Sequence, residues 1–180
     1  MRKVLFILLL ILTGNELQAQ QTFRTTSGEV HFNASTPLED IDARNKKVNA
    51  ILKTESGDFA SVLLVREFEF RRKLMQEHFN ENFMESGRFP KAHLRAKLQG
   101  LDSIALSAGG TCQLVGTLTI HGVSREFNTR ARLRPGPRTL LLEAAFVLRP
   151  EDFDIEVPKI LFNKIAEEVD VKVSLPLEVQ

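Results

Sequence analysis

Histidine is the side chain best suited to proton transfer or metal binding near neutral pH, and four occur in this chain of 180 residues. His78, Glu81 and Glu85 are separated by three and four residues, so a helix would place them on one face. Metal sites use such spacing, but a full set of three or four ligands is not visible. We therefore expect His78 to be structural, hydrogen-bonded to a strand. The competing hypothesis is an enzyme that uses His78 and Glu81.

The remaining candidates for chemistry have simpler interpretations. His121 precedes Gly122 and is expected in a turn, whereas His31 and His93 fall on the polar sides of strands. Cys112 is the only cysteine, so it cannot form an internal disulfide. No histidine lies near it in the sequence, and we expect a buried or half-buried small side chain rather than a nucleophile. The sequence predicts no catalytic residue, no cofactor and no metal.

Charge and aromatic content narrow the choice of partner. The chain has 24 basic and 23 acidic residues and a formal charge of +1, which gives no electrostatic reason to expect nucleic acid or an anionic membrane. It has 13 phenylalanines but neither tryptophan nor tyrosine, so its aromatic side chains carry no polar group. Such side chains suit a dry apolar cavity, and they suit an ordinary core equally well.

The first residues have the layout of a secretory signal peptide. Arg2 and Lys3 precede an apolar run over 4–12, and Leu17-Gln18-Ala19 offers a small residue for cleavage. The run is shorter than the ~20 residues of a membrane-spanning helix. We expect a signal peptide at 1–19 and one exported domain at 20–180, periplasmic or secreted, with no integral membrane span after cleavage. An uncleaved anchor is the alternative.

Alternation of apolar and polar residues predicts about eight strands joined by short connections. They cover 28–35, 47–54, 59–70, 93–98, 111–120, 126–133, 139–148 and 169–178. Residues 38–45 are expected to form a loop, 101–107 are weakly patterned, and 150–164 form an irregular connection with an apolar centre at Ile160, Leu161 and Phe162. The fold class is therefore all-β, as an antiparallel barrel or sandwich, and the length of the strands favours the barrel.

One helix interrupts this pattern between 74 and 83. Met75, Phe79 and Phe83 recur every four residues, and Gly87 is the expected end of the segment. A single helix in an all-β chain must pack on a sheet or cover the end of a barrel.

Phenylalanines and leucines of the strands and the helix could line a cavity or fill a solid core. The residues concerned are Phe68, Phe70, Phe79, Phe83, Leu118, Phe127, Leu142 and Phe146. An eight-stranded barrel can be filled by side chains or hold one small ligand, and the sequence alone favours the filled core. Arg66, predicted on an apolar face, is a candidate partner for the polar end of a ligand. Alternatively, it simply reaches the barrel mouth.

Several motifs, in order, resemble the YceI-like family, and most closely its branch in Bacteroidetes-type bacteria. They are Gly28-Glu29-Val30-His31-Phe32, Phe68-Glu69-Phe70, the block Leu74 to Phe83, Arg88-Phe89-Pro90, the hairpin Leu118-Thr119-Ile120-His121-Gly122-Val123 and Asp152-Phe153-Asp154-Ile155. The resemblance covers about 21–179. Tyrosine is common in the family near the helix and the following corner, where this chain has Phe83 and Phe89, so a phenolic contact to a ligand head group would be missing.

The resemblance implies a lipocalin-like, eight-stranded antiparallel barrel that holds a polyisoprenoid or similar amphiphile. It favours a cavity over a filled core, and it carries no catalytic motif. The predicted function is thus an exported carrier or sequestering protein for an isoprenoid- or lipid-like ligand. A ligand-free structural or interaction domain is the alternative, and association into a homodimer stays open.

Overall fold

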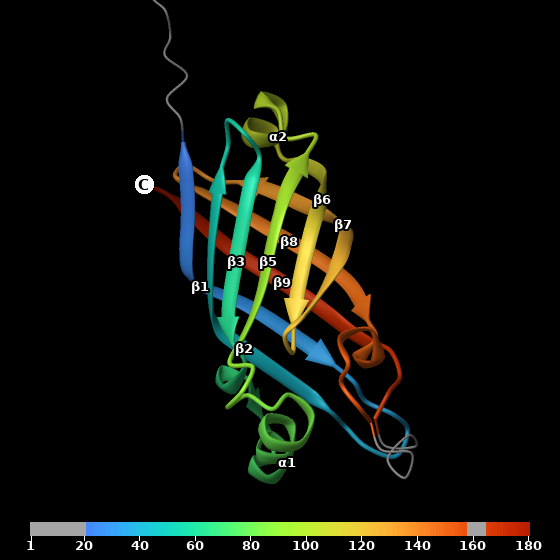
Figure 1. Ribbon diagram of the computed structural model, residues 1–180. Helices are drawn as coiled ribbons and strands as arrows, with labels where there is room; N and C mark the ends of the chain where they lie inside the picture. Colours follow the sequence, from blue (N-terminus) through green and yellow to red (C-terminus); the bar gives the residue numbers. More distant parts are fainter. Residues whose placement is uncertain (1–20, 158–164) are drawn as a thin grey trace, which may run out of the picture.

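The chain forms one antiparallel sheet that closes on itself. The computed structural model describes residues 21–157 and 165–180, so the predicted signal peptide and the apolar centre at Ile160, Leu161 and Phe162 lie outside the described residues. The long strands are β1 (Thr22–Asn33), β2 (Asp42–Lys53), β3 (Asp58–Leu64), β5 (Lys91–Gln99), β6 (Gly110–Ile120), β7 (Val123–Pro135), β8 (Thr139–Leu148) and β9 (Val169–Val179). Their order is β1-β9-β8-β7-β6-β5-β3-β2, and β1 pairs again with β2. This confirms the predicted eight-stranded barrel (Figure 1).

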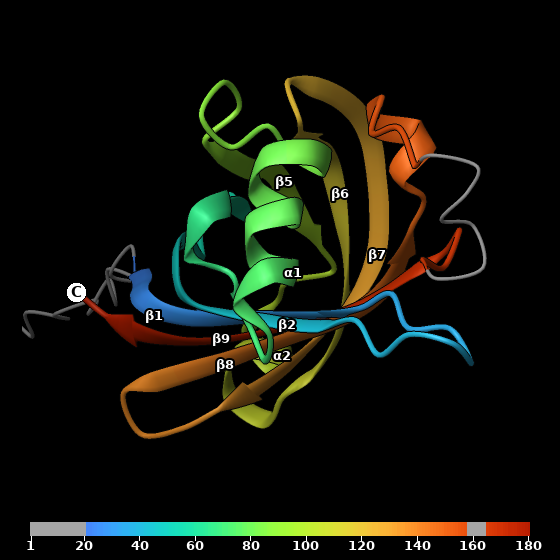
Figure 2. The ribbon, with the colours of Figure 1, turned by 90° about the horizontal axis from the view of Figure 1, so that it is seen from below.

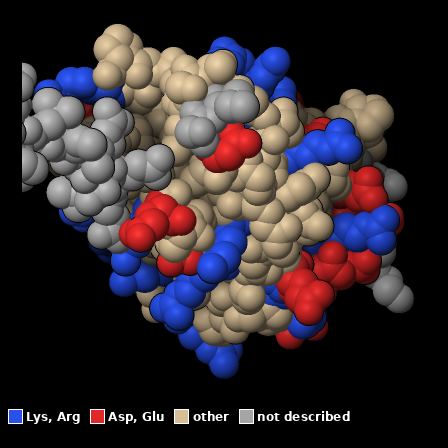
Figure 3. All heavy atoms as spheres, turned by 90° about the horizontal axis from the view of Figure 1, so that it is seen from above, with Lys and Arg blue, Asp and Glu red and all other residues tan. Residues whose placement is uncertain are grey.

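Short helices cover the two ends of the barrel. Helix α1 (Lys73–His78) continues into a π-helical turn, η2 (Phe79–Phe83), and lies across one end (Figure 2). Helix α2 (Ser103–Ala108) lies at the other end (Figure 1), where uncharged residues form a broad continuous area (Figure 3). The helix at 74–83 is thus confirmed as an end cover. Helix α2 was not predicted, because its segment is too short and weakly patterned for a helical period to emerge.

The first two strands begin earlier than the sequence pattern predicts. β1 starts at Thr22 and β2 at Asp42, so much of the predicted loop at 38–45 is strand. In β1 the inward side chains pass from Thr25 to Gly28, and the pairing register shifts there. β2 likewise passes from Asn45 to Val48. These irregularities reverse the alternation within each strand, which hides its first half from a period-two search.

The predicted long strand at 59–70 is wrong. β3 ends at Leu64, a 3₁₀ turn (η1, Val65–Glu67) follows, and only Glu69–Phe70 form a further short strand, β4, paired with β2. The buried side chain of Asn45 fixes the break, because its Nδ2 donates to the carbonyl oxygen of Leu64 at 2.9 Å. A 3₁₀ helix has three residues per turn, whereas side chains of a strand alternate between two faces. The turn therefore breaks the alternation, and Arg66 does not share a side with Phe68.

The interior of the barrel differs between its two ends. Toward α2 it is filled by leucines with at most 1% of their surface exposed: Leu52, Leu133, Leu140 and Leu177. Ala105 of α2, 7% exposed, packs onto this filled half. Toward α1 the inward side chains surround a cavity. The core and the cavity therefore share one barrel, stacked along its axis.

Candidate ligand cavity

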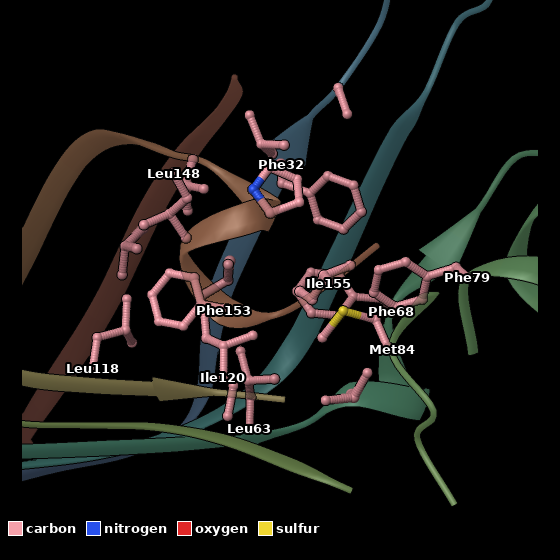
Figure 4. A pocket seen from close by; sticks show the side chains of 18 of the residues that line it. Phe32, Leu63, Phe68, Phe79, Met84, Leu118, Ile120, Leu148, Phe153 and Ile155 are labelled. Atoms are coloured by element: carbon pink, nitrogen blue, oxygen red, sulfur yellow. The ribbon is translucent and has the colours of Figure 1, made fainter. Parts of the chain in front are cut away.

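A cavity of about 610 Å³ occupies the half of the barrel beneath α1. This lies within the ~300–1,000 Å³ of typical small-molecule sites. Its floor is formed by Leu114, Leu142 and Leu175, which are at most 3% exposed. Its walls are almost entirely apolar, as Figure 4 shows for Leu63, Leu118, Ile120, Leu148 and Ile155. The opening at the α1 end is called the mouth below.

Four phenylalanine rings meet beside the helix. The rings of Phe32 and Phe79 stack with centroids 5.5 Å apart, and Phe68 contacts both, at 5.1 and 5.7 Å. Phe70 completes the cluster, 5.0 Å from Phe79. The rings come from β1, the segment after β3 and the first turn of η2 (Figure 4), so the cluster joins the helical cover to the barrel wall. Edge-on and offset contacts of this kind are favourable beyond simple burial.

Eight of the nine predicted site residues lie on the cavity. They are Phe68, Phe70, Phe79, Phe83, Leu118, Phe127, Leu142 and Phe146. Arg66 does not: its side chain is 72% exposed, and its Nε lies 3.9 Å from Oε1 of neighbouring Glu67. The 3₁₀ turn at Val65–Glu67 directs it outward. Phe32 and Phe153 also line the cavity and were not predicted to do so, although the alternation of Val30 and Phe32 with polar neighbours was a usable signal for Phe32.

Two other arginines border the cavity, each with an acidic partner. Arg72, at the start of α1, pairs with Glu39 of the β1–β2 connection. Arg149, after β8, contacts Oε1 of Glu168 with Nη2 at 2.7 Å and Nε at 3.2 Å. The hydrogen bond and charge of Glu168 raise the pKa of Arg149. Both cations are therefore compensated at the edge of the cavity.

The histidines and the cysteine lie in different parts of the barrel. His78 borders the mouth with an exposed side chain, and His93 also borders the cavity, although its strand position predicts a polar surface. Burial raises the pKa of the Cys112 thiol, which is 2% exposed in the filled half, and nearby Asp102 raises it further. Within the part of the chain that the structure describes, no three His, Cys, Asp or Glu side chains gather closely enough to hold a metal ion.

His31 lies outside the cavity and contacts an aspartate. Its Nε2 pairs with Oδ2 of Asp42 between β1 and β2. Burial raises the pKa of Asp42, but the hydrogen bond and charge of His31, helped by Arg44, outweigh this and leave the pKa below its usual value.

The segment that carries α1 is attached to the barrel at both ends. Before the helix, β4 pairs with β2, and Arg71 and Arg72 pair with Asp40 and Glu39 of the β1–β2 connection. After the helix, the ring of Phe89 lies edge-on to His121, with centroids 4.4 Å apart. The cover is thus fixed at two separated points.

His121 is the centre of the second attachment. It occupies the two-residue hairpin between β6 and β7 with φ 51°, followed by Gly122 with φ 76°, which confirms the predicted turn. Its Nδ1 donates to the carbonyl oxygen of Phe153 at 3.2 Å, and its buried Nε2 lies 3.9 Å from Oε1 of Glu85. The hairpin, the segment after α1 and the turn at Phe153 therefore meet at one side chain.

Among the described residues, no helix is long and apolar enough to cross a membrane. Solved structures that share the fold include the following three proteins. A polyisoprenoid binding domain from Saccharophagus degradans, implicated in plant cell wall breakdown, is 15% identical with a TM-score of 0.75, and the match covers 89% of this chain and 99% of that chain. BcnA of Burkholderia cenocepacia is 15% identical, with a TM-score of 0.72 over 83% of this chain and 95% of that one.

The YCEI protein of Campylobacter jejuni is 14% identical, with a TM-score of 0.56 over 76% of this chain and 82% of that chain. No curated protein sequence matches the chain. The sequence model of the YceI-like domain family, however, matches residues 12–177, which is almost the whole length of the chain. The closed barrel with its covered cavity and this match agree, and the chain belongs to the YceI-like family.

Proposed function

We propose that this protein is an exported carrier that holds an isoprenoid- or lipid-like chain in the barrel. The observation that carries the proposal is the apolar cavity of about 610 Å³ beneath α1, walled by aromatic and aliphatic side chains. Burial of apolar surface contributes ~25 cal/mol per Å², before the entropy cost of ordering the ligand. The resemblance in fold to a polyisoprenoid binding domain supports the same class of ligand.

The composition of the cavity walls favours a protein that binds its ligand without converting it. Their polar groups are few, and Arg72 and Arg149 are each paired with a glutamate. The rival enzyme would use His78 and Glu81, which both have exposed side chains on the cover. We expect the double variant His78→Ala/Glu81→Ala to retain ligand as well as the natural protein.

Purification from the producing cells, followed by native mass spectrometry and lipid extraction, tests the carrier role. A lipid that co-purifies at one molecule per chain is the expected result. If no lipid co-purifies and added geranylgeraniol does not bind, the carrier proposal is wrong.

Export is a separate part of the proposal and needs its own measurement. The basic start and apolar run of residues 1–19 support it. The mass of the mature protein should correspond to a chain that begins near Gln20, recovered from the periplasm or the medium. A full-length chain retained in the cytoplasm would contradict export and leave the cavity proposal intact.

A further inference from the structure

The barrel wall is incomplete between β7 and β8 on the side of the mouth. The two strands pair from Pro135↔Leu140 to Ala131↔Ala144. By contrast, β6 and β7 pair as far as Ile120↔Val123, and β8 and β9 as far as Leu148↔Val169. Among the described residues, β7 before Ala131 and β8 after Ala144 thus face each other without ladder bonds. A bond of 3.4 Å from Thr129 Oγ1 to the carbonyl oxygen of Ala145 marks where the strands separate.

A groove runs along the outside of this gap. Its outer lining consists of Arg125, Glu126, Asn128, Val147, Asp152 and Glu168. The remaining lining residues also line the cavity: Phe127, Phe146, Leu148, Arg149 and Phe153. Cavity and groove therefore lie against the same five residues. Val147, an apolar residue that is 50% exposed, lies in this groove.

Two aromatic rings close the gap. The rings of Phe127 and Phe146 meet edge to face, with centroids 4.8 Å apart and an angle of 79° between their planes. Between β6 and β7, and between β8 and β9, separating the strands at this height would break backbone hydrogen bonds. Between β7 and β8, rotation of the two rings about their side-chain torsions would break no backbone hydrogen bond, because the contact between the rings is held by packing alone.

The filled half of the barrel limits how far a bound chain can extend along the barrel axis. Below the floor residues Leu114, Leu142 and Leu175, the interior is solid. A chain that enters at the mouth therefore cannot continue along the axis. Along β8 the inward residues from Leu142 to Phe146 lead from the floor back toward the mouth, so the ring pair lies on the cavity wall between the floor and the mouth. A chain longer than the cavity must fold back or leave through the side.

We propose that the gap between β7 and β8 is a side portal, closed by Phe127 and Phe146, through which the tail of a long apolar chain passes into the outer groove. The proposal rests on the carrier function above and extends it to ligands longer than the cavity. The chain's polar end stays at the mouth, its middle fills the cavity, and its tail lies against Phe146, Leu148 and Val147.

Photo-crosslinking locates the tail directly. The full-length mature protein is loaded with geranylgeraniol or with the longer solanesol, each carrying a diazirine at the tail end, and labelled peptides are mapped by mass spectrometry. We expect the short probe to label the floor strands and the long probe to label 145–149 and 125–128. Labelling of only the floor or the mouth by bound solanesol would overturn the portal and leave the carrier role standing. If neither probe binds, both proposals are wrong.

A pair of matched variants tests the outer groove. Val147→Glu places a charge in the groove without altering a cavity residue, and Leu141→Glu makes the same change at an outward position of β8 within the part that pairs with β7. We expect Val147→Glu to weaken solanesol binding about tenfold, with geranylgeraniol unaffected. Leu141→Glu should change neither affinity. Equal effects of Val147→Glu on both probes, or none on either, would overturn the proposal, provided that melting curves show folded protein.

Discussion

The two halves of this barrel are built from the same strands and enclose opposite contents. In the half toward α2, leucines such as Leu133 and Leu177 are at most 1% exposed and fill the interior. In the half toward α1, side chains of the same strands surround about 610 Å³ of space, beneath a half-buried cover. Phenylalanine rings take the place of interlocking leucines there.

The difference separates stability from binding. Close packing removes apolar surface from water permanently, whereas a cavity wall gains that burial only when a ligand enters. We therefore expect the leucine half to determine the free energy of unfolding and the phenylalanine half to determine affinity. Each of the following changes would break or sharpen this contrast.

Leu133→Ala should have the largest effect. Its side chain is 1% exposed in the filled half, and truncation there leaves a void that the surrounding barrel cannot close. We expect the free energy of unfolding, measured with urea, to fall by about 3 kcal/mol. The control Leu74→Ala removes a side chain that is 61% exposed on α1, and it should cost less than about 0.5 kcal/mol. Similar values for the two variants would refute the contrast.

Cys112 reports whether the filled half excludes solvent. The thiol is 2% exposed and its pKa is raised by burial, so little thiolate is present or accessible at pH 8. We expect alkylation to be at least about a hundredfold slower than in urea-unfolded protein, equivalent to ~2.7 kcal/mol. A cysteine introduced at Leu74 in a Cys112→Ser background should react rapidly. Equally fast reaction of the two would show that the half toward α2 opens.

Phe79→Ala should separate the two properties at the cover. The ring is half-buried and contacts Phe32, Phe68 and Phe70. We expect the free energy of unfolding to fall by only about 1 kcal/mol, because the ring is not fully buried. Geranylgeraniol affinity, measured by native mass spectrometry or calorimetry, should fall about tenfold. A stability loss as large as that of Leu133→Ala, without loss of affinity, would reverse the proposed division.

Asp42→Asn should have the smallest effect on the free energy of unfolding, and this effect should depend on pH. The pKa of Asp42 is lowered in the folded protein, so its contribution is present above the ordinary value of 3.8 and is lost as the pH falls through the folded-state value. We expect a cost of less than about 1 kcal/mol at pH 7. Urea titrations should show that this cost disappears in acid. A cost independent of pH would mean that the His31 contact does not stabilise the fold through its charge.

The sequence predicted the strands wherever alternation is unbroken. In β9, inward Val171, Leu175 and Leu177 follow the expected period; counting such strands predicted the all-β class, and their length favoured the barrel over the sandwich. The halves of β1 and β2 that were missed lie beside irregularities at Gly28 and before Val48, where the period reverses. Local alternation does not encode such a shift, because it is fixed by pairing with distant strands.

Eight of the nine residues predicted for the candidate site line the cavity, but its geometry was not predicted. Phe127 and Phe146 are apolar residues on inward faces, which periodicity identifies, yet the same pattern fits a filled core. Whether inward side chains meet across the barrel depends on its diameter and on the height of each residue along the axis. Arg66 does not line the cavity, because it lies within the 3₁₀ turn that ends the strand predicted to continue to Phe70.

The attachment of the α1 segment at both ends has a consequence for which molecules can enter. A segment attached at one end can rotate away from the barrel and admit bulky molecules, but a segment attached at both ends can only bend outward at its centre. Ion pairs at Arg71 and Arg72 hold one end, and the contact of Phe89 with His121 holds the other. Bowing would open narrow slits along the helix, which suit a slender flexible chain. A rigid fused-ring sterol of equal apolar area should therefore load much more slowly, so that entry would select ligands by cross-section.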